Sequence, residues 1–169
     1  MLHSFQNISF RDEQTGLYSE AYFMEVFYRE WHHMIREQLA LSLLVVRPNL
    51  NLITEDGLKE YILLAQLLGD ATKRQTDVVS RFHNNEFVVG LFNLDSEGTT
   101  AVIERIKASV EQKNGQLVHL NRVLIGAMNV APGRETDINT IFNQVMAIDA
   151  ASHSGAKNEK ISYQLQAYS

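Results

Sequence analysis

Two short apolar runs separated by a polar tip constrain the fold of this chain more than any other feature. The runs are Val78–Phe82 and Glu86–Phe92, and the tip between them reads His83-Asn84-Asn85. Runs of this length around a tight polar turn predict a β-hairpin. Asparagine tolerates the left-handed backbone conformation, so the tip can close without glycine. The sequence therefore places a pair of antiparallel strands in the middle of the chain.

Helices and further strands are predicted on both sides of the hairpin. Capping residues and apolar side chains at helical spacing indicate helices, and continuous apolar runs indicate buried strands. The predicted elements are a helix from Ser19 to about Gln38, a strand at Leu39–Val46, a helix opening at Asp56-Gly57, the hairpin, a helix introduced by Leu94-Asp95-Ser96, strand signals at Leu117–Ala131 broken near His119–Asn121, a helix capped by Asp137 and a short edge strand at Ile161–Leu165. This β-α-β-β-α-β core with extra terminal helices predicts an α+β fold, with a mostly antiparallel sheet flanked by helices.

Composition narrows the class of protein. The 169 residues suit one domain (1–169, core at about 12–165), and 45% hydrophobic residues with two prolines indicate a globular chain. The net charge of −5 argues against nucleic acid or anionic membrane as a partner. The chain has no cysteine, no apolar run near the ~20 residues of a membrane span and no signal-peptide pattern. We therefore expect a cytoplasmic protein. The same features are compatible with a domain that belongs to a longer protein.

Several motifs, in order, resemble the GGDEF family, the diguanylate cyclases. Residues 12–17 read Asp-Glu-Gln-Thr-Gly-Leu and are similar to the family motif Asp-x-Leu-Thr-Gly-Leu, with Gln14 the one departure. Phe23 and a long helix containing Trp31 follow at the expected distance, and residues 41–44 resemble the start of the family's first strand. The resemblance covers about 12–165 and implies the palm-like cyclase fold. An unrelated α+β domain is the alternative, which several ordered motifs disfavour.

The hairpin tip departs from the family at the positions that carry chemistry. The family has Gly-Gly-Asp/Glu-Glu-Phe here, where the glycines admit a nucleotide and the first acidic residue holds a catalytic metal. In this chain His83 and Asn84 replace the glycines, and Asn85 replaces the metal-binding carboxylate. Only Glu86 and Phe87 agree with the family pattern.

The other metal-binding positions depart as well. Two-metal phosphoryl transfer needs carboxylates to hold divalent ions, but Arg47 and Asn49 stand where the family's first strand ends Asp-x-Asp. A guanidinium places positive charge where the cation would lie, and two like charges ~4 Å apart repel by roughly 4 kcal/mol at an effective dielectric constant of about 20. We therefore expect no catalytic residues, no metal and no cofactor. Residual cyclase activity would need Glu86 and unexpected ligands to hold magnesium.

Nucleotide recognition is altered in the same way. The stretch Leu52–Gly57 is shorter than the family's guanine-reading loop and contains no histidine. Near the C-terminus, alignment on Gly155 puts Ser152 and Ala156 where the family has a phosphate-binding lysine and arginine. Lys157 is a partial substitute in the wrong register. We expect no diguanylate cyclase activity.

One family site is retained. Residues 74–77 read Arg-Gln-Thr-Asp, one strand before the hairpin tip, and the family's inhibitory site for cyclic di-GMP is an Arg-x-x-Asp at this spacing. Counting without a gap from Phe87 puts Arg105 at the position of that site's second arginine. An arginine binds a phosphate or the guanine O6/N7 edge bidentately. Aspartate accepts hydrogen bonds from guanine N1–H and the exocyclic amine, so Arg74, Asp77 and Arg105 are the predicted ligand residues.

Non-functional interpretations of these residues stay open at this point. Arg-x-x-Asp is a weak motif, and a second copy at 134–137 ends in Asp137, a predicted helix cap. Arg74 is equally compatible with a solvated residue at a helix end, favoured by the helix dipole, and Asp77 with a turn residue. Arg81 is interpreted as structural.

The leading hypothesis is a catalytically inactive GGDEF domain that acts as a cyclic di-GMP receptor. The family often binds this ligand as a stacked pair bridging two sites, so the resemblance implies ligand-promoted association into a homodimer or with a partner signalling protein. The main rival is a protein-interaction or dimerisation module without a ligand. Residual diguanylate cyclase activity on GTP is the third hypothesis.

Overall fold

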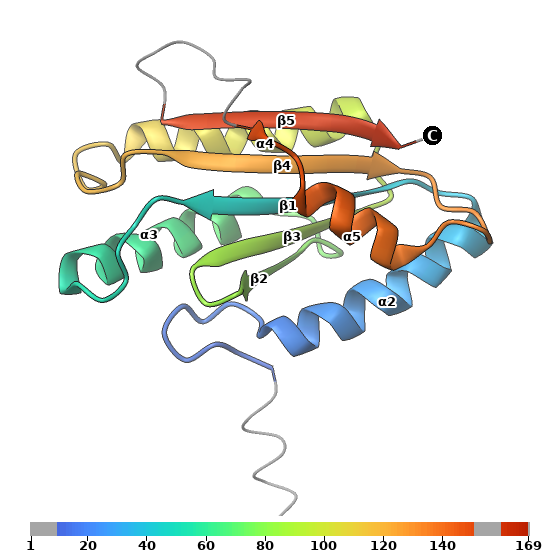
Figure 1. Ribbon diagram of the computed structural model, residues 1–169, viewed down its shortest axis with the longest axis horizontal. Helices are drawn as coiled ribbons and strands as arrows, with labels where there is room; N and C mark the ends of the chain where they lie inside the picture. The colour runs from blue at the N-terminus through green and yellow to red at the C-terminus, as the bar shows by residue number, and fades with distance from the viewer. Residues whose placement is uncertain (1–9, 151–159, 169) are drawn as a thin grey trace, which may run out of the picture.

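Residues 10–150 and 160–168 are described by the computed structural model. A five-stranded sheet carries helices on both of its faces (Figure 1). The elements are α2 (Glu20–Glu37), β1 (Leu41–Pro48), α3 (Glu55–Ala71), β2 (Val78–Phe82), β3 (Glu86–Phe92), α4 (Ser96–Gln112), β4 (Val123–Val130), α5 (Ile138–Met146) and β5 (Ile161–Tyr168).

The sheet is mixed, with strand order β2-β3-β1-β4-β5. β1 pairs antiparallel with both β3 and β4, and β2 pairs antiparallel with β3. Only the pairing of β4 with β5 is parallel. The predicted α+β fold with a mostly antiparallel sheet is therefore confirmed, and the hairpin has the strand boundaries that its sequence predicts.

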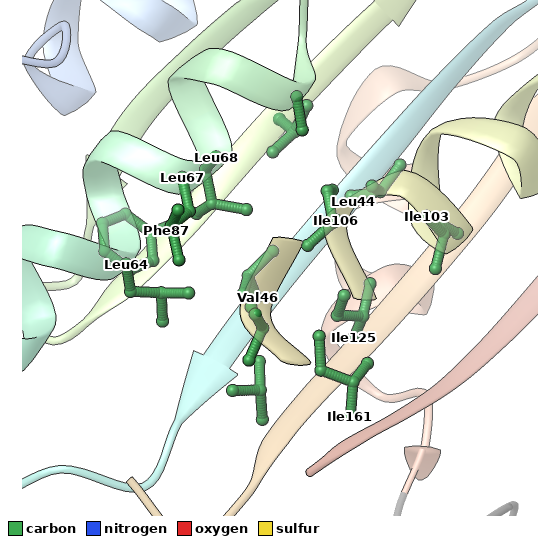
Figure 2. Close-up of a cluster of buried hydrophobic side chains, with 14 of the residues drawn as sticks. Leu44, Val46, Leu64, Leu67, Leu68, Phe87, Ile103, Ile106, Ile125 and Ile161 are labelled. Carbon is green, nitrogen blue, oxygen red and sulfur yellow. The ribbon is translucent and has the colours of Figure 1, made fainter. Parts of the chain in front are cut away.

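Two apolar clusters hold the layers together, one on each face of the sheet. Side chains of β1 alternate between them: Leu44 and Val46 join the cluster under α3 and α4, whereas Leu43 and Val45 join the cluster under α2 and α5. Figure 2 shows Leu44 and Val46 on the first face, with side chains of α3 and α4 around them. None of the helices in the described part of the chain has the length and apolarity of a membrane-spanning helix.

Capping side chains fix where the helices begin. Ser19, Asp95 and Asp137 each accept a backbone N–H three residues later, as the sequence predicts. α3 begins earlier than predicted, at Glu55, because the Thr54 hydroxyl accepts from the Gly57 amide. The predicted opening at Asp56-Gly57 was therefore slightly late.

The bounds of three strands differ from the sequence prediction. β1 spans Leu41–Pro48 rather than the predicted Leu39–Val46. The signal from Leu117 to the predicted break belongs to a loop, whose side chains Leu117 and Leu120 are buried without joining the sheet. At the end of the chain, β5 continues beyond the predicted Leu165 to Tyr168 because every one of its residues pairs with β4. Burial and strand pairing are separate properties, and an apolar run reports only the first.

Candidate functional site

The predicted site residues form two groups at opposite ends of the β2–β3 hairpin. Strand pairing brings Phe82 opposite Glu86 at the tip end and Val78 opposite Gly90 at the other end. The tip group is Arg47, Asn49, Asn85 and Glu86, and the group at the other end is Arg74, Asp77 and Arg105.

An arginine–glutamate pair occupies the position where the resemblance places a metal. Arg47 Nε lies 3.4 Å from Glu86 Oε2, and the two side chains are only 25% and 20% exposed. Arg47 Nη2 also donates to the Met146 carbonyl over 2.8 Å, at the C-terminal end of α5, where a cation is favoured by the helix dipole. The Arg47 guanidinium thus links β1, β3 and α5.

The hairpin tip closes through residues with positive φ. The loop between Phe82 and Glu86 has three residues, of which His83 has φ +48° and Asn84 has φ +70°. Asn84 takes the left-handed conformation that its residue type predicts. The second residue of the tip with positive φ is His83 and not Asn85. The imidazole Nδ1 of His83 lies 3.8 Å from Glu86 Oε1.

The tip end offers a poor set of donors for a divalent cation. Magnesium and calcium prefer several oxygen ligands around one point, but the carboxylate of Glu86 already faces the Arg47 guanidinium, and that of Glu20 accepts the His83 amide over 2.9 Å. Asn49 and Asn85 are exposed. Among the described residues, no group of three or more His, Asp or Glu side chains is arranged to hold a metal ion. These side chains do not fit the divalent ions that the resemblance implies.

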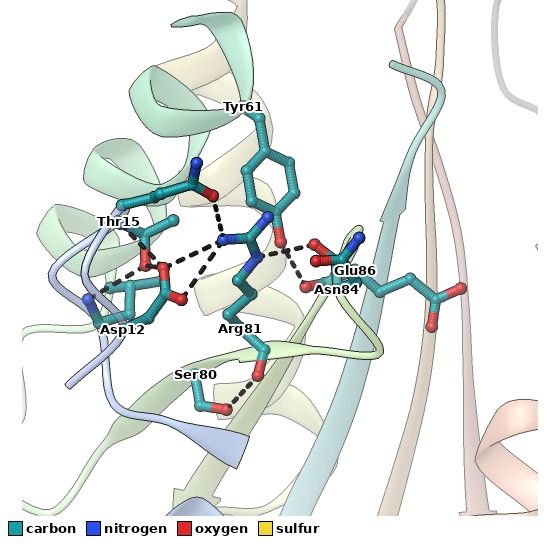
Figure 3. Close-up of polar contacts among 9 residues, drawn as sticks. Asp12, Thr15, Tyr61, Ser80, Arg81, Asn84 and Glu86 are labelled. Atoms are coloured by element: carbon teal, nitrogen blue, oxygen red, sulfur yellow. Dashed lines mark hydrogen bonds and ion pairs between the residues drawn. The ribbon is translucent and has the colours of Figure 1, made fainter. Parts of the chain in front are cut away.

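Arg81 joins the N-terminal motif to the hairpin. Its Nη1 donates to Gln14 Oε1 over 2.6 Å and to the Asp12 carboxylate over 3.3 Å, while its Nε donates to the Asn84 carbonyl over 2.7 Å. The guanidinium also lies 5.0 Å from the centre of the Tyr61 ring. Figure 3 shows this arginine between the 12–15 segment and the tip. The interpretation of Arg81 as structural agrees with these contacts, and Gln14, the departure from the family motif, is one of them.

The buried phenol of Tyr61 fixes the start of β3. Its hydroxyl donates to the Glu86 carbonyl over 2.7 Å, and its ring stacks on Phe87 with centroids 4.4 Å apart. Burial raises the pKa of Tyr61, and this effect is larger than that of the positive charge of Arg81, which lowers the pKa. The phenol therefore keeps the proton that it donates in this hydrogen bond.

At the other end of the hairpin, Arg74, Asp77 and Arg105 come together. The Arg74 amide donates to Asp77 Oδ2 over 3.0 Å, and the Asp77 amide donates to the Arg74 carbonyl over 3.0 Å, which closes the turn. Arg105 on α4 lies beside this turn, where its Nε donates to the Ala71 carbonyl at the end of α3 over 2.9 Å. Burial raises the pKa of Asp77. The hydrogen bond from the Arg74 amide and the positive charges of Arg74 and Arg105 lower this pKa, but their effect is smaller than that of burial.

The two arginines differ in their surroundings. Arg74 Nη2 donates to the carbonyls of Phe92 and Asn93, over 2.8 and 3.2 Å, so the guanidinium is bound to the end of β3. Because α3 ends at Ala71, Arg74 is not the solvated helix end considered from the sequence. Arg105 is exposed, with Nε bound to Ala71.

Buried side-chain atoms without a hydrogen bond are found only at these two ends within the described residues. They are Nη1 of Arg74, Oδ1 of Asp77 and Oε1 of Glu86. An unpaired buried polar atom usually costs about 1–3 kcal/mol, and such atoms tend to mark functional positions.

The sequence prediction missed one buried charge. Glu60 accepts the amides of His119 and Leu120 over 2.9 to 3.0 Å, and its Oε2 lies 2.6 Å from His119 Nδ1. A glutamate four residues before Leu64, on the apolar side of a predicted helix, was the available signal. The predicted phosphate-site replacements Ser152, Ala156 and Lys157 lie outside the described residues.

Comparison with known proteins agrees with this fold. The family described as diguanylate cyclase, GGDEF domain, matches residues 58–158, more than half of the chain. The solved GGDEF domain of FimX from Pseudomonas aeruginosa is 19% identical with a TM-score of 0.74, over 94% of this chain and 99% of that one. No curated protein matches this chain significantly in sequence.

Two similar structures are described as complexes with cyclic di-GMP. The GGDEF domain of DgcB from Caulobacter crescentus is 15% identical with a TM-score of 0.72, over 90% of this chain and 94% of that one. LapD from Vibrio cholerae, an S helix-GGDEF-EAL protein, is 15% identical with a TM-score of 0.70, over 97% of this chain and 38% of that one. At these identities the similarity establishes the fold.

Proposed function

The chain belongs to the GGDEF family, and from this premise we propose that it is a catalytically inactive member that binds cyclic di-GMP through Arg74, Asp77 and Arg105. The observation that carries the proposal is the turn that Arg74 and Asp77 close through the Arg74 amide, with Arg105 bound at the adjacent end of α3. Two of the three also hold buried polar atoms that no described residue satisfies.

The three side chains suit the chemistry of a cyclic dinucleotide. Arg105 is exposed and binds Ala71 through Nε, so its guanidinium is suited to a phosphate or to the O6/N7 edge of guanine. Asp77 has one carboxylate oxygen held by the Arg74 amide, and its other oxygen is an unused acceptor for guanine N–H groups. Related GGDEF domains described in complex with cyclic di-GMP lend support by analogy.

Calorimetry with cyclic di-GMP tests ligand binding. Arg105→Ala removes a charge-assisted contact worth about 1.5–3 kcal/mol, so we expect affinity to fall about 10- to 150-fold. Arg74→Ala is also expected to weaken binding. Lys59→Ala is the matched control, because it removes one exposed positive charge from the first half of α3, away from the turn. Absence of heat with the native protein, or equal loss in the control, would rule out this receptor site.

The proposed inactivity follows from the pairing of Arg47 with Glu86. The Arg47 guanidinium forms an ion pair with the Glu86 carboxylate, which a metal would need as a ligand. Its hydrogen bond to the Met146 carbonyl holds it in this position. Incubation with GTP and Mg²⁺, followed by chromatography, is expected to yield no cyclic di-GMP above the level without protein. Product that accumulates in proportion to protein concentration would show that the protein is a cyclase.

A second candidate function is a protein-interaction module without ligand. Its supporting observation is a pair of exposed apolar side chains, Ile53 at 96% and Val118 at 66% exposure. Ile53 stands on the loop before α3 and Val118 on the loop after α4, where the neighbouring His119 contacts Glu60 and lies 3.9 Å from Asp56 on α3. Ile53→Asp is expected to abolish any ligand-independent self-association seen by sedimentation; unchanged association would remove this candidate.

A further inference from the structure

The guanidinium of Arg74 is already occupied by the protein itself. Its Nη2 donates to two backbone carbonyls, those of Phe92 and Asn93, where β3 turns towards α4. A side chain that must bind an anionic ligand is therefore engaged by internal acceptors in this structure.

The internal contact satisfies Arg74 incompletely. Arg74 Nη1 and Asp77 Oδ1 are both buried and both lack a hydrogen bond. The arrangement thus leaves a donor and an acceptor unused at the same turn. A ligand that supplies an acceptor to the arginine and donors to the aspartate would satisfy both, which the carbonyls of Phe92 and Asn93 cannot do.

The acceptors belong to a backbone corner that is held from both sides. Phe92 is 1% exposed, and the amide and carbonyl of Leu94 are bound by Ala40 and Asn129. Between them, Asn93 has φ +55°, a conformation that most side chains avoid. By contrast, Gln75 and Thr76 in the turn beside Arg74 are exposed. The two carbonyls therefore belong to a fixed corner, whereas Arg74 belongs to a turn at the surface.

We propose that the Phe92 and Asn93 carbonyls form a latch that holds Arg74 in the ligand-free protein, and that cyclic di-GMP releases it. This inference rests on the proposed function of the same site. Ligand phosphate or guanine oxygens replace the two carbonyls as acceptors, while Asp77 keeps the turn closed through the Arg74 amide. The latch competes with the ligand, so it sets the affinity and couples the site to the β3–α4 corner.

Carbonyl ¹³C chemical shifts in the ligand-free and ligand-saturated native protein test the latch. We expect the carbonyl shifts of Phe92 and Asn93 to change on binding of cyclic di-GMP, because both carbonyls lose the hydrogen bond from Arg74 Nη2. The Met146 carbonyl is the matched control: Arg47 binds it in the same way, at the other end of the hairpin, and its shift is expected to stay unchanged. Binding without movement at Phe92 and Asn93, or with equal movement at Met146, overturns the latch and leaves the receptor function standing. Absence of binding overturns both.

Substitution of Asn93 gives an independent measurement. A β-branched side chain is strongly disfavoured at positive φ, so Asn93→Val is expected to disturb the corner, weaken the latch and tighten ligand binding several-fold. Asn93→Gly accepts the same φ and is expected to bind like the native protein. Equal affinity of a folded Asn93→Val protein and the Asn93→Gly protein would contradict the latch.

Discussion

Replacing Glu60 with alanine is expected to lower the free energy of unfolding by about 3 kcal/mol or more. The carboxylate satisfies the amides of His119 and Leu120 in a buried position, and each amide left unpaired costs about 1–3 kcal/mol. Loss of the contact to the His119 ring adds to this. Urea unfolding followed by circular dichroism measures the change.

Glu111→Ala is the matched control for this prediction. Glu111 is an exposed glutamate near the end of α4, and surface substitutions usually change stability by less than about 0.5 kcal/mol. A Glu60→Ala protein no less stable than the Glu111→Ala protein would contradict the role of Glu60 in fixing the loop after α4.

The contribution of Glu60 is also expected to depend on pH in a known direction. Burial alone would raise its pKa, but the hydrogen bonds from His119 and Leu120 together outweigh burial and lower it below 4.5. A lowered carboxyl pKa stabilises the fold fully above the unfolded-state pKa and loses this effect as pH falls through the folded-state pKa. The stability difference between the native protein and Glu60→Gln should therefore shrink as pH is lowered from neutrality to below 4. A difference that grows with acidity would have the wrong sign.

Replacing Phe27 with alanine is expected to cost about 3–5 kcal/mol, the usual range for a buried phenylalanine. The side chain is fully buried, and its ring contacts aromatic rings from three elements. Its neighbours are Phe23 and Trp31 on α2, Phe92 on β3 and Phe142 on α5. Removal of the ring leaves a cavity where α2, α5 and the sheet meet, and thermal unfolding should show it as a lower midpoint.

The adjacent Tyr28 provides the control for Phe27. It lies on the same helix with a ring of similar size but is 57% exposed, and Tyr28→Ala is expected to change stability by less than about 1 kcal/mol. Comparable losses in the two variants would mean that helix propensity, rather than packing, dominates at this part of α2.

Local patterns predicted most of the fold because they act over a few residues. The hairpin followed from two apolar runs and a turn, and the helix starts at Ser19, Asp95 and Asp137 followed from capping residues. The prediction was less accurate where one signal has two causes. Leu117 and Leu120 are apolar because they are buried, and only the pairing pattern shows that they lie outside β4.

The candidate site was predictable in its residues but not in its contacts. The positions of Arg74, Asp77 and Arg105 followed from spacing to the hairpin. Their partners did not, because Arg74 binds carbonyls from residues 92 and 93, and backbone carbonyls have no sequence signature. For the same reason, the sequence could not predict that the Met146 carbonyl accepts a hydrogen bond from Arg47.

The sequence by itself determined the elements, their order, the GGDEF family and the chemical substitutions at the hairpin tip. These depend on residue type and short-range spacing, which the chain carries directly. Tertiary structure alone decided that Arg47 faces Glu86 at one end of the hairpin and that Arg74 is bound by the β3–α4 corner at the other. The direction of a long charged side chain depends on which acceptors the folded chain brings within reach, and those acceptors come from segments far apart in the sequence.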